Sequence, residues 1–334
     1  MHRSADLKFE ISNVRSGRRA QKIRSAYQGS QSGCLAGRGG PAPFEVIVVA
    51  ARDRIDPVLT PEGVRWLAAE PGAGVPRLRR LGLDAARAPV VAFTEDSCRL
   101  GPGWVEAWLQ AFRDPLVPAA TGPVAPAMGD AALDWAVFFC EYAPFLPSGR
   151  EGVGPPDRLA GNNFAIRHDL RDALDRAEVH ETEVLRAASA SSGGLALVSP
   201  ARADHVRRYG WREAFGDRFR FGLEYGRLRA GRLSTRVRPI GLVVGPAVLA
   251  VQAARLVTVV LGRPTYLGPF ARALPLTLAL LSAWSAGEWL GWASAAIRPR
   301  SACRRRGTAA RRPARSPAPA GSSPRRYRPA PPRA

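Results

Sequence analysis

An apolar run that ends in two adjacent carboxylates constrains this chain most. Residues 90–94 are apolar and favour a buried strand, and Glu95 and Asp96 follow them directly. A Gly-Pro-Gly turn at 101–103 comes next, and residues 104–112 then place apolar side chains at the three- and four-residue steps of an amphipathic helix. In open α/β sheets, ligands bind beyond the carboxyl ends of the strands. We therefore expect the two acids to lie at a binding site.

Neighbouring patterns predict that these acids belong to an α/β fold. Residues 44–50 are almost continuously apolar, as in a parallel strand that is covered on both faces. Residues 78–88 place leucine and alanine at helical spacing between arginines. Short apolar runs at 119–124 and 195–198, the latter expected to be the last strand, and an apolar helix at 131–142 continue the alternation. This order predicts a sheet that is flanked by helices.

Two glycine-containing segments allow more than one interpretation. Residues 144–156 are rich in glycine and proline and are expected to form a flexible loop, which is a candidate lid for a site at the strand ends. Gly161, Asn162 and Asn163 fit either a tight turn or a close approach of the backbone to a ligand. Taken alone, this second segment favours the turn.

Acidic residues and a histidine come later in the chain. Glu181 and Glu183 lie in an acidic segment around His180, which by itself is typical of a solvated helix face. His205 follows the expected last strand. A lone histidine is more often a structural or surface residue than a ligand.

The chain is strongly basic, which raises the question of a polyanionic partner. The formal net charge is +21, and only Lys8 and Lys22 among the 49 basic residues are lysines, which leaves 47 arginines. A bias of this kind is more typical of coding composition than of a nucleic-acid surface, so no nucleic-acid partner is expected. The four cysteines lack CxxC spacing, which indicates reduced thiols in the cytoplasm.

The two ends of the chain lack the patterns of a folded core. In residues 1–42 the apolar residues are too sparse for a lasting helix or strand period, so we expect a disordered basic arm without an export signal. Residues 298–334 consist mostly of Arg, Pro, Ala and Ser, and we expect a disordered tail. The folded α/β domain is expected at 43–238.

Two long apolar segments follow this domain. Residues 240–261 comprise about 22 residues, or ~33 Å of helix against a hydrocarbon core of ~30 Å, and residues 274–297 are the second candidate span. Arg255 and Glu288 lie within them and, by helix rise, would not face each other in a hairpin. We predict a two-helix transmembrane hairpin over 239–297. The alternative is a pair of buried or interfacial helices of a soluble protein.

The distribution of arginine predicts the orientation of this hairpin. Three arginines at 232, 236 and 238 precede the hairpin and five at 298, 300 and 304–306 follow it, whereas the connection holds only Arg263 and Arg272. By the positive-inside rule, we expect the α/β domain and both termini to face the cytoplasm. The basic and aromatic stretch at 207–238 would then rest on anionic lipid headgroups, with nucleic acid as the competing interpretation.

Taken in order, the motifs carry a family resemblance. They are Glu45-Val46-Ile47-Val48-Val49, residues 79–85, Val91-Ala92-Phe93-Thr94-Glu95-Asp96, Gly103-Trp104, Gly161-Asn162-Asn163-Phe164-Ala165-Ile166-Arg167 and Glu181-Thr182-Glu183-Val184-Leu185. From about residue 44 to 238 the chain resembles family 2 glycosyltransferases of the GT-A fold, and residues 286–288 resemble the membrane hairpin of some of these enzymes. The resemblance implies an α/β fold with a mixed, mainly parallel sheet. No single motif is specific, and the order of six weak matches supports it.

The resemblance also implies a substrate and its metal ion. Members of this family bind a nucleotide-sugar diphosphate through Mg²⁺ or Mn²⁺, because these cations take oxygen ligands and neutralise charge on the departing diphosphate. Glu95 and Asp96 match the metal-binding acids, and His205 matches a histidine that often completes the site. Arg79 matches a basic residue near the diphosphate.

The remaining matches imply the catalytic base and the acceptor. Glu181 matches the base that deprotonates the acceptor hydroxyl in inverting members, with Glu183 as the second choice. The loop of Gly161, Asn162 and Asn163 matches one that contacts the donor sugar or the acceptor. The implied activity is transfer of a sugar to a lipid-linked or polysaccharide acceptor of the cell envelope, at the cytoplasmic membrane face.

Three departures from the family pattern lead to an alternative. Ser97 occupies the outer position of the acidic motif, where a second aspartate is usual, and Ala50 occupies a strand end that normally carries an aspartate. The usual first strand and its Pro-containing turn are not apparent in residues 1–42, which a truncated or misplaced start would explain. The alternative is a catalytically inactive membrane scaffold or polyanion-binding protein that keeps the fold.

Overall fold

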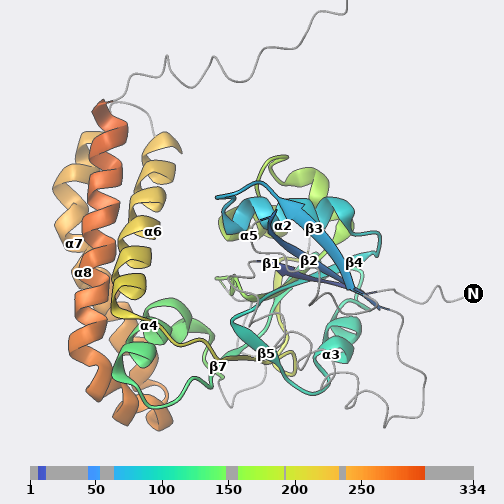
Figure 1. Cartoon of the computed structure of the whole chain (residues 1–334), viewed down its shortest axis with the longest axis horizontal. Coiled ribbons are helices and arrows are strands. Elements are labelled where there is room, and N and C mark those ends of the chain that lie inside the picture. Colours follow the sequence, from blue (N-terminus) through green and yellow to red (C-terminus); the bar gives the residue numbers. More distant parts are fainter. Residues whose placement is uncertain are drawn as a thin grey trace, which may run out of the picture.

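A seven-stranded mixed sheet forms the centre of the molecule (Figure 1). The computed structural model describes residues 7–12, 44–52, 64–147, 157–191, 193–232 and 238–297. The strands, in sheet order, are β3 (Val64–Ala69), β2 (Phe44–Ala51), β1 (Leu7–Ser12), β4 (Val90–Glu95), β8 (Asn163–Arg167), β6 (Ala119–Thr121) and β9 (Leu195–Leu197). The first four are parallel, β8 is antiparallel to both of its neighbours, and β6 and β9 are parallel. The expected mixed, mainly parallel sheet is confirmed.

A strand near the amino terminus lies in the middle of this sheet. β1 pairs in parallel with β2 on one side and with β4 on the other, where Ser12 is in register with Glu95. The expectation that residues 1–42 contain no strand is therefore wrong for residues 7–12. Their sequence, Leu-Lys-Phe-Glu-Ile-Ser, alternates apolar and polar residues with the two-residue period of a strand, but six residues inside a basic segment give a weak signal. The residues after β1, where the family would have its Pro-containing turn, lie outside the described residues.

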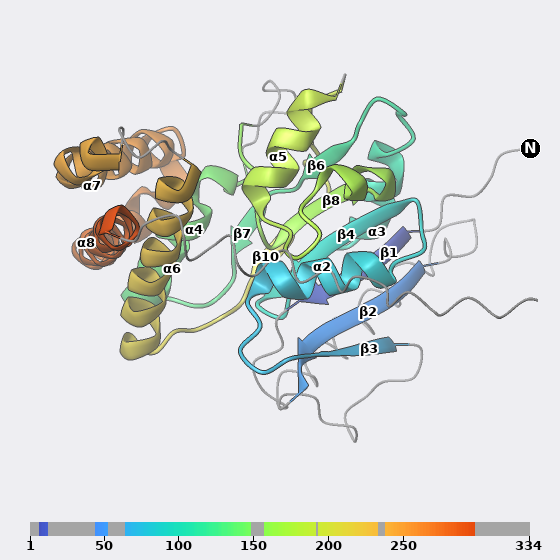
Figure 2. The ribbon, with the colours of Figure 1, turned by 90° about the horizontal axis from the view of Figure 1, so that it is seen from above.

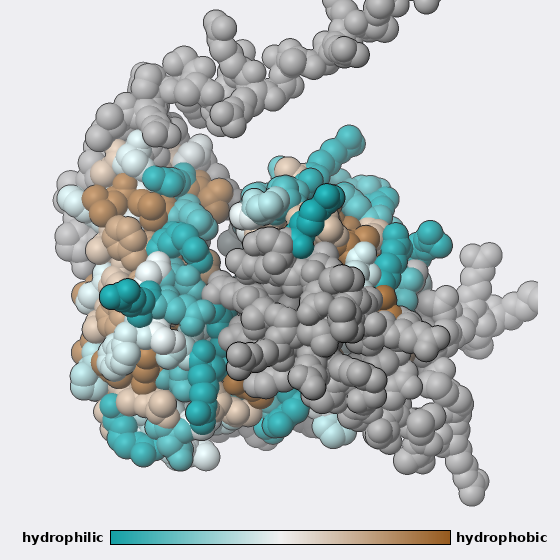
Figure 3. All heavy atoms as spheres, in the orientation of Figure 1, coloured by the Kyte–Doolittle hydropathy of each residue, from teal (hydrophilic) through white to brown (hydrophobic). Residues whose placement is uncertain are grey.

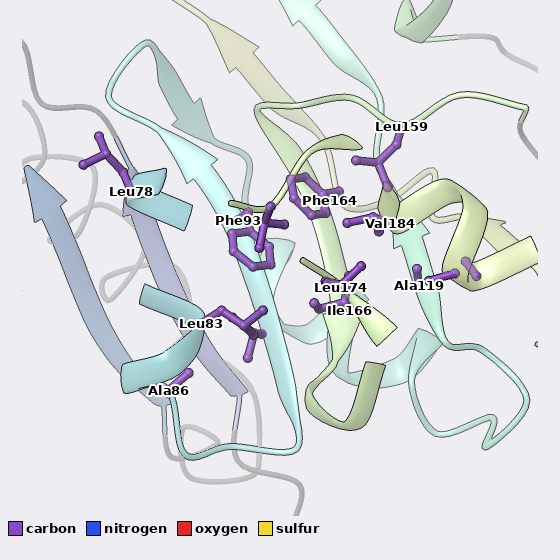
Figure 4. Packing of buried hydrophobic residues seen from close by; sticks show 14 of the residues in the cluster. Leu78, Leu83, Ala86, Phe93, Ala119, Leu159, Phe164, Ile166, Leu174 and Val184 are labelled. Atoms are coloured by element: carbon purple, nitrogen blue, oxygen red, sulfur yellow. The ribbon is translucent and has the colours of Figure 1, made fainter. Parts of the chain in front are cut away.

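Helices α2 (Val75–Ala85) and α5 (Glu181–Ala190) cover one face of the sheet (Figure 2). Beneath them the rings of Phe93 on β4 and Phe164 on β8 stack with their centroids 4.5 Å apart, and Leu83 of α2 packs into the same cluster (Figure 4). These side chains are fully buried. Because β4 and β8 are covered here, their sequences are almost continuously apolar.

Helix α3 (Trp104–Ala111) covers the opposite face. Trp104 and Trp108 are buried, and their rings meet edge to face with centroids 5.7 Å apart. The four-residue step between them places both rings on one side of the helix, as the sequence predicted. α3 therefore closes the second face of the sheet directly after the turn that follows the two acids.

A second, smaller sheet has the order β5 (Cys98–Leu100), β10 (Ala203–His205) and β7 (Val124–Pro126). It corrects two predictions. The single strand expected at 119–124 is split between the two sheets, because Pro123 has no N–H and Gly122 lies so close to Ala201 that a Cβ atom would clash with its carbonyl oxygen. The strand at 195–198 is not the last one, since β10 follows it.

Four long helices form a layer beside the sheet (Figures 1 and 2). They are α4 (Ala132–Tyr142), α6 (Trp211–Arg232), α7 (Arg238–Leu261) and α8 (Leu267–Ile297). α7 and α8 are outermost, and α4 and α6 lie between them and the sheet. Within the described part of the chain, one helical stretch, Pro264–Ser294, is long and apolar enough to cross a membrane, and Ala247–Leu261 is a shorter apolar helix. The expected candidate lid lies largely outside the described residues.

Candidate active site

Arg79 of α2 joins two acids from distant parts of the chain. Its Nη1 atom donates a hydrogen bond to Oε1 of Glu181 at 2.8 Å, and its Nη2 atom donates to the carbonyl oxygen of Gly161 at 2.8 Å. Nη2 also lies 3.6 Å from Oε1 of Glu95. The guanidinium is 2% exposed and lies over the ring of Phe164, 5.5 Å from its centroid. The structure thus brings together an arginine and two acids that the sequence separates widely.

Glu95, at the carboxyl end of β4, has an unusual protonation equilibrium. Burial raises its pKa to about 7, and the positive charge of Arg79 opposes this shift only in part. The neighbouring acids Asp96, Glu181 and Glu141 raise it further. One guanidinium that is shared among several carboxylates cannot neutralise all of them. This end of the strand therefore carries negative charge that a proton or a cation would relieve.

Glu181 begins helix α5 and has the opposite shift. Burial favours its neutral form, but the charge of Arg79, its own backbone N–H and the hydrogen bond from Arg79 together outweigh burial, so the pKa of Glu181 is lowered. The side chain is 39% exposed. An ionised carboxylate at this position is therefore open to solvent. Glu183 lies two residues further along the first turn of the same helix. Residues two apart do not share a helix face, so the side chains of Glu181 and Glu183 leave α5 on different sides.

Asp96 and Ser97 form the turn between β4 and β5, and both are largely buried. The hydroxyl of Ser97 donates to Oε2 of Glu95 at 3.5 Å, and its backbone carbonyl accepts from the N–H of Val206 at 2.8 Å. The outer position of the acidic motif therefore supplies a hydroxyl to Glu95 in place of another carboxylate. Ala50 is fully buried within β2.

Asn162 lies next to the strand-end acids with part of its amide unused. Its side chain is fully buried, and Nδ2 donates to Sγ of Cys98 at 3.2 Å. Within the described residues, Oδ1 of Asn162 has no hydrogen-bond partner. Burial raises the pKa of the Cys98 thiol to about 12, so Cys98 stays protonated. A buried amide oxygen without a partner is a suitable acceptor for a hydroxyl of a bound molecule.

Asn163, by contrast, is bound within the fold. Its Oδ1 atom accepts from Nε1 of Trp104 at 2.8 Å, and Nδ2 donates to the carbonyl oxygens of Pro123 at 2.9 Å and Ala201 at 2.7 Å. These bonds tie β8 to helix α3 and to the loops that lead into β7 and β10. The resemblance implied a ligand contact for this loop, which for Asn163 stays a prediction, and the bonds described here give its amide a role in holding the scaffold.

Gly161 has a steric role beside Arg79. A Cβ atom at this position would clash with Oε1 of Glu181 and would press on the guanidinium of Arg79. Glycine therefore allows Arg79 to reach both the carbonyl oxygen of Gly161 and Glu181. The ligand contact that the sequence predicted for Gly161 remains a prediction.

His205, on β10, is buried among aromatic rings. Its centroid lies 4.9 Å from that of Tyr142 and 6.0 Å from those of Phe138 and Tyr209. Nε2 of the imidazole lies 3.2 Å from the hydroxyl of Tyr209, and Nδ1 has no hydrogen-bond partner among the described residues. Burial, and then the charge of Arg207, lower the pKa of His205 to about 3, so the ring is neutral.

The predicted metal ligands are not assembled into a complete site. In the part of the chain that the structure describes, no three His, Cys, Asp or Glu side chains come together at metal-binding spacing. His205 lies on β10, and its register partner on the neighbouring strand β5 is Cys98, two residues after Asp96 in the sequence. Nevertheless, Mg²⁺ in nucleotide sites is commonly held by one or two carboxylates together with the phosphates of the substrate. Glu95, with its raised pKa, and Asp96 beside it fit a cation that arrives with a diphosphate.

Comparisons with known proteins were made for sequence and for shape. No family model matches the chain, and no curated protein matches it. Similar solved structures include the mannosyltransferase PcManGT from Pyrobaculum calidifontis in complex with GDP-Man and Mn²⁺, at 13% identity over 84% of this chain and 86% of that chain, with a TM-score of 0.48. They also include GalNAc-T7 with UDP, GalNAc and Mn²⁺, at 13% identity over 61% of this chain and 44% of that chain, with a TM-score of 0.43.

Both structures are similar to this chain in shape alone, with TM-scores below 0.5. A third structure of similar shape is described only as a mycobacterial protein, at 14% identity over 65% of this chain and 73% of that chain, with a TM-score of 0.42.

Two charged groups near the site were absent from the sequence-based prediction. Burial raises the pKa of Glu141 on α4, and Arg218 of α6, 3.5 Å away, opposes the shift. Arg207 pairs with Glu213 and lies over the ring of Tyr209, 4.7 Å from its centroid. The signal for Glu141 was available, because it is an acid near the end of a mostly apolar helix. Its link to the strand ends depends on how α4 packs, which the sequence does not reveal.

Proposed function

We propose that this chain transfers a sugar from a nucleotide-sugar donor to the hydroxyl of an acceptor, by direct displacement with inversion. The observation that supports it best is the joining of Glu95 and Glu181 by Arg79. Like charges at close range lower stability, and perturbed acids of this kind cluster at functional sites. The group also lies beyond the carboxyl end of β4, where α/β sheets bind ligands.

Glu95 and Asp96 are the residues that would hold a divalent cation, Mg²⁺ or Mn²⁺, together with the donor diphosphate. A bound cation of this kind neutralises charge on the departing diphosphate. Asn162 is placed to accept a hydrogen bond from the donor sugar through Oδ1. We assign no ligand role to His205 in the arrangement described, because its ring is enclosed by aromatic side chains.

Glu181 is the proposed catalytic base, with Glu183 as the second choice. A base must be ionised before the reaction, and the lowered pKa of Glu181 keeps it ionised at neutral pH. Its partial exposure leaves room for an acceptor hydroxyl. Arg79 is buried behind both acids, so we assign it the positioning of Glu95 and Glu181 in place of the expected contact with the diphosphate.

The acceptor and the location are part of the same proposal. One helical stretch among the described residues, Pro264–Ser294, is apolar enough over its length to attach the protein to a membrane. We propose a lipid-linked or polysaccharide acceptor at the cytoplasmic face of that membrane. Neither the sugar nor the nucleotide is specified by the residues described.

The proposal is tested by incubating the purified protein with a panel of nucleotide-sugars and Mg²⁺ or Mn²⁺ and measuring nucleotide release. Glu181→Gln is expected to lower kcat by ~10²- to 10⁴-fold, the usual contribution of a general base. Because the substitution also weakens a contact of the buried Arg79, activity is measured well below the unfolding midpoint of the variant. Glu178→Gln is the matched control, because Glu178 is an exposed acid of the preceding segment that contacts His180. It is expected to retain full activity.

Donor binding is measured separately by thermal unfolding. A nucleotide-sugar at 100 times its dissociation constant stabilises the folded state by ~2.7 kcal/mol. If no donor in the panel stabilises the protein or is turned over, with or without the cation, the inactive scaffold is the better interpretation.

A further inference from the structure

Helix α8 is packed along its length against helices that also carry charged residues. In its first half, the ring of Phe270 meets that of Phe139 on α4 with centroids 5.1 Å apart, and the carbonyl oxygen of Thr277 accepts a hydrogen bond from Cys140 of α4 at 3.7 Å. In its second half, α8 lies along α6. The helix therefore extends beside the α/β unit, at the same level, and does not project away from it (Figure 1).

Glycines bring the backbones of α6 and α8 into direct contact. Gly222 and Gly226 form one four-residue step on α6, and Gly287 and Gly291 form another on α8. A Cβ atom at any of these four positions would clash with a backbone carbonyl oxygen of the other helix. Residues four apart share one face of a helix, so each pair forms a flat contact surface. This close packing leaves no room for lipid between the two helices.

An ion pair joins the same two helices. Oε1 of Glu288 lies 2.6 Å from Nη1 of Arg229 on α6. Glu288 is 3% exposed, whereas the side chain of Arg229 is 48% exposed. Glu288 is the only acid in the sequences of α7 and α8, and its partner lies on α6. The solvent-exposed side of α6 carries further charged residues. Its exposed residues include Arg220, Glu224 and Arg227.

These contacts restrict how α8 can meet a membrane. If α8 crossed the hydrocarbon while packed in this way, the charged residues of α6 would enter the hydrocarbon with it. Charged side chains inside a bilayer are costly unless they face protein or water. α4 would also have to follow, although it packs beside the candidate site. The packed arrangement is therefore incompatible with a transmembrane α8.

The outer surface of α7 and α8 is nevertheless apolar. Only 28% of the apolar window of α8 is buried inside the molecule. The large apolar side chains that are exposed on these helices are Val251, Val257, Leu261, Leu267, Leu278, Trp289 and Leu290. We call these seven residues the outer apolar surface. In Figure 3, brown apolar patches with teal polar residues between them appear on the face of this layer that is in view. An apolar surface of this extent on a soluble protein indicates an interaction site.

We propose that the outer apolar surface inserts into one leaflet of an anionic membrane, so that α7 and α8 lie in the membrane plane and neither helix crosses it. The same helices carry two exposed arginines, Arg255 on α7 and Arg272 on α8. Among the described residues, α7 and α8 have no exposed acid that would neutralise this positive charge. This charge complements lipid phosphates. It disfavours a two-fold dimer through the same surface, which would place equivalent arginines near each other. In-plane attachment replaces the expected transmembrane hairpin and does not depend on enzymatic activity.

The first test locates the connection between α7 and α8 relative to the membrane. Single cysteines are introduced by Thr265→Cys, which is nearly isosteric and exposed, and by Asp172→Cys, on the α/β unit with a side chain 87% exposed. Both are made in a background with Cys34→Ser and Cys303→Ser, since Cys98 and Cys140 are largely enclosed in the fold. Right-side-out and inside-out membrane vesicles are then treated with an impermeant maleimide. In-plane attachment predicts that both cysteines are labelled in the same vesicle type, whereas labelling from opposite sides overturns the proposal.

The second test measures binding of the purified protein to vesicles of phosphatidylcholine with and without phosphatidylglycerol. Val251→Glu with Leu278→Glu is expected to lower binding by more than tenfold. Leu116→Glu, at an apolar residue of the α/β unit that is 61% exposed, is the matched control and should bind normally. Arg255→Gln and Arg272→Gln should each weaken binding to the anionic vesicles by about fivefold. Binding that ignores all four changes on α7 and α8, or a protein that binds no vesicle, overturns the proposal.

Discussion

Two buried contacts between arginine and glutamate serve different purposes in this molecule. At the strand ends, Arg79 is shared between Glu95 and Glu181, and the pKa of Glu95 stays high because the positive charge is insufficient. In the helical layer, Arg229 pairs with Glu288 alone and remains half exposed. Because the buried guanidinium of Arg79 is shared by two carboxylates, part of their negative charge is not neutralised. This remaining charge can bind the metal ion that accompanies a substrate. A one-to-one pair at the edge of a helix contact instead sets the register of two helices.

Removal of Arg79 should produce the largest effect. Arg79→Met leaves the largely buried Glu95 and the partly exposed Glu181 without their cation. Losing one partner of a buried pair typically destabilises by ~3 to 5 kcal/mol, and the exposure of Glu181 places the expected loss at the lower end of this range. Urea denaturation at pH 7 measures the free energy of unfolding. Arg77→Gln on the same helix is the control, because Arg77 forms a more exposed pair with Glu70, and we expect no resolvable shift of the midpoint. Equal effects of the two changes would contradict the central role of Arg79.

The pH dependence of stability should reveal the charge deficit at Glu95. Its pKa is about 7 in the folded state against 4.5 for an ordinary glutamate. Between these values the folded state holds a proton that the unfolded chain has released, so the free energy of unfolding falls as the pH rises from about 4.5 to 7 and is level above that. At ~1.4 kcal/mol per pH unit, the upper limit of the loss is ~3.5 kcal/mol.

Glu95→Gln tests this assignment directly. The substitution should remove most of the slope between pH 4.5 and 7 and should make the protein more stable than the parent at pH 8. Glu178→Gln, at an exposed acid, should leave the slope unchanged. A parent protein whose stability is constant across this window would show that Glu95 titrates normally.

The pair in the helical layer should show a smaller and asymmetric effect. Arg229→Gln leaves the charge of Glu288 buried and uncompensated, which we expect to destabilise by ~2 kcal/mol. Glu288→Gln leaves a half-exposed arginine that water can solvate, and we expect a loss below ~1 kcal/mol. Urea denaturation of both variants provides the comparison. A larger loss for Glu288→Gln would mean that the pair itself, and not the burial of Glu288, holds the helices together.

Several elements were predictable because their signals are local. β2 and β4 are long apolar runs, and α3 and α4 repeat apolar residues at helical spacing. β1 was missed because its two-residue alternation lasts for only six residues. β10 has three residues, Ala203–His205, and is a strand only because β5 and β7 lie on both sides of it. No local pattern reports a pairing of that kind.

The sequence by itself determined that Glu95 and Asp96 end a buried strand and that the last long helix is apolar, because strand and helix periodicities are properties of neighbouring residues. The tertiary structure decided which charges meet. Arg79 reaches Glu181, 102 residues away, and Glu288 reaches Arg229 on α6, although the sequence suggested no partner for it. Such contacts, and the pKa values that follow from them, depend on how separate elements pack and exclude water, which no stretch of sequence contains.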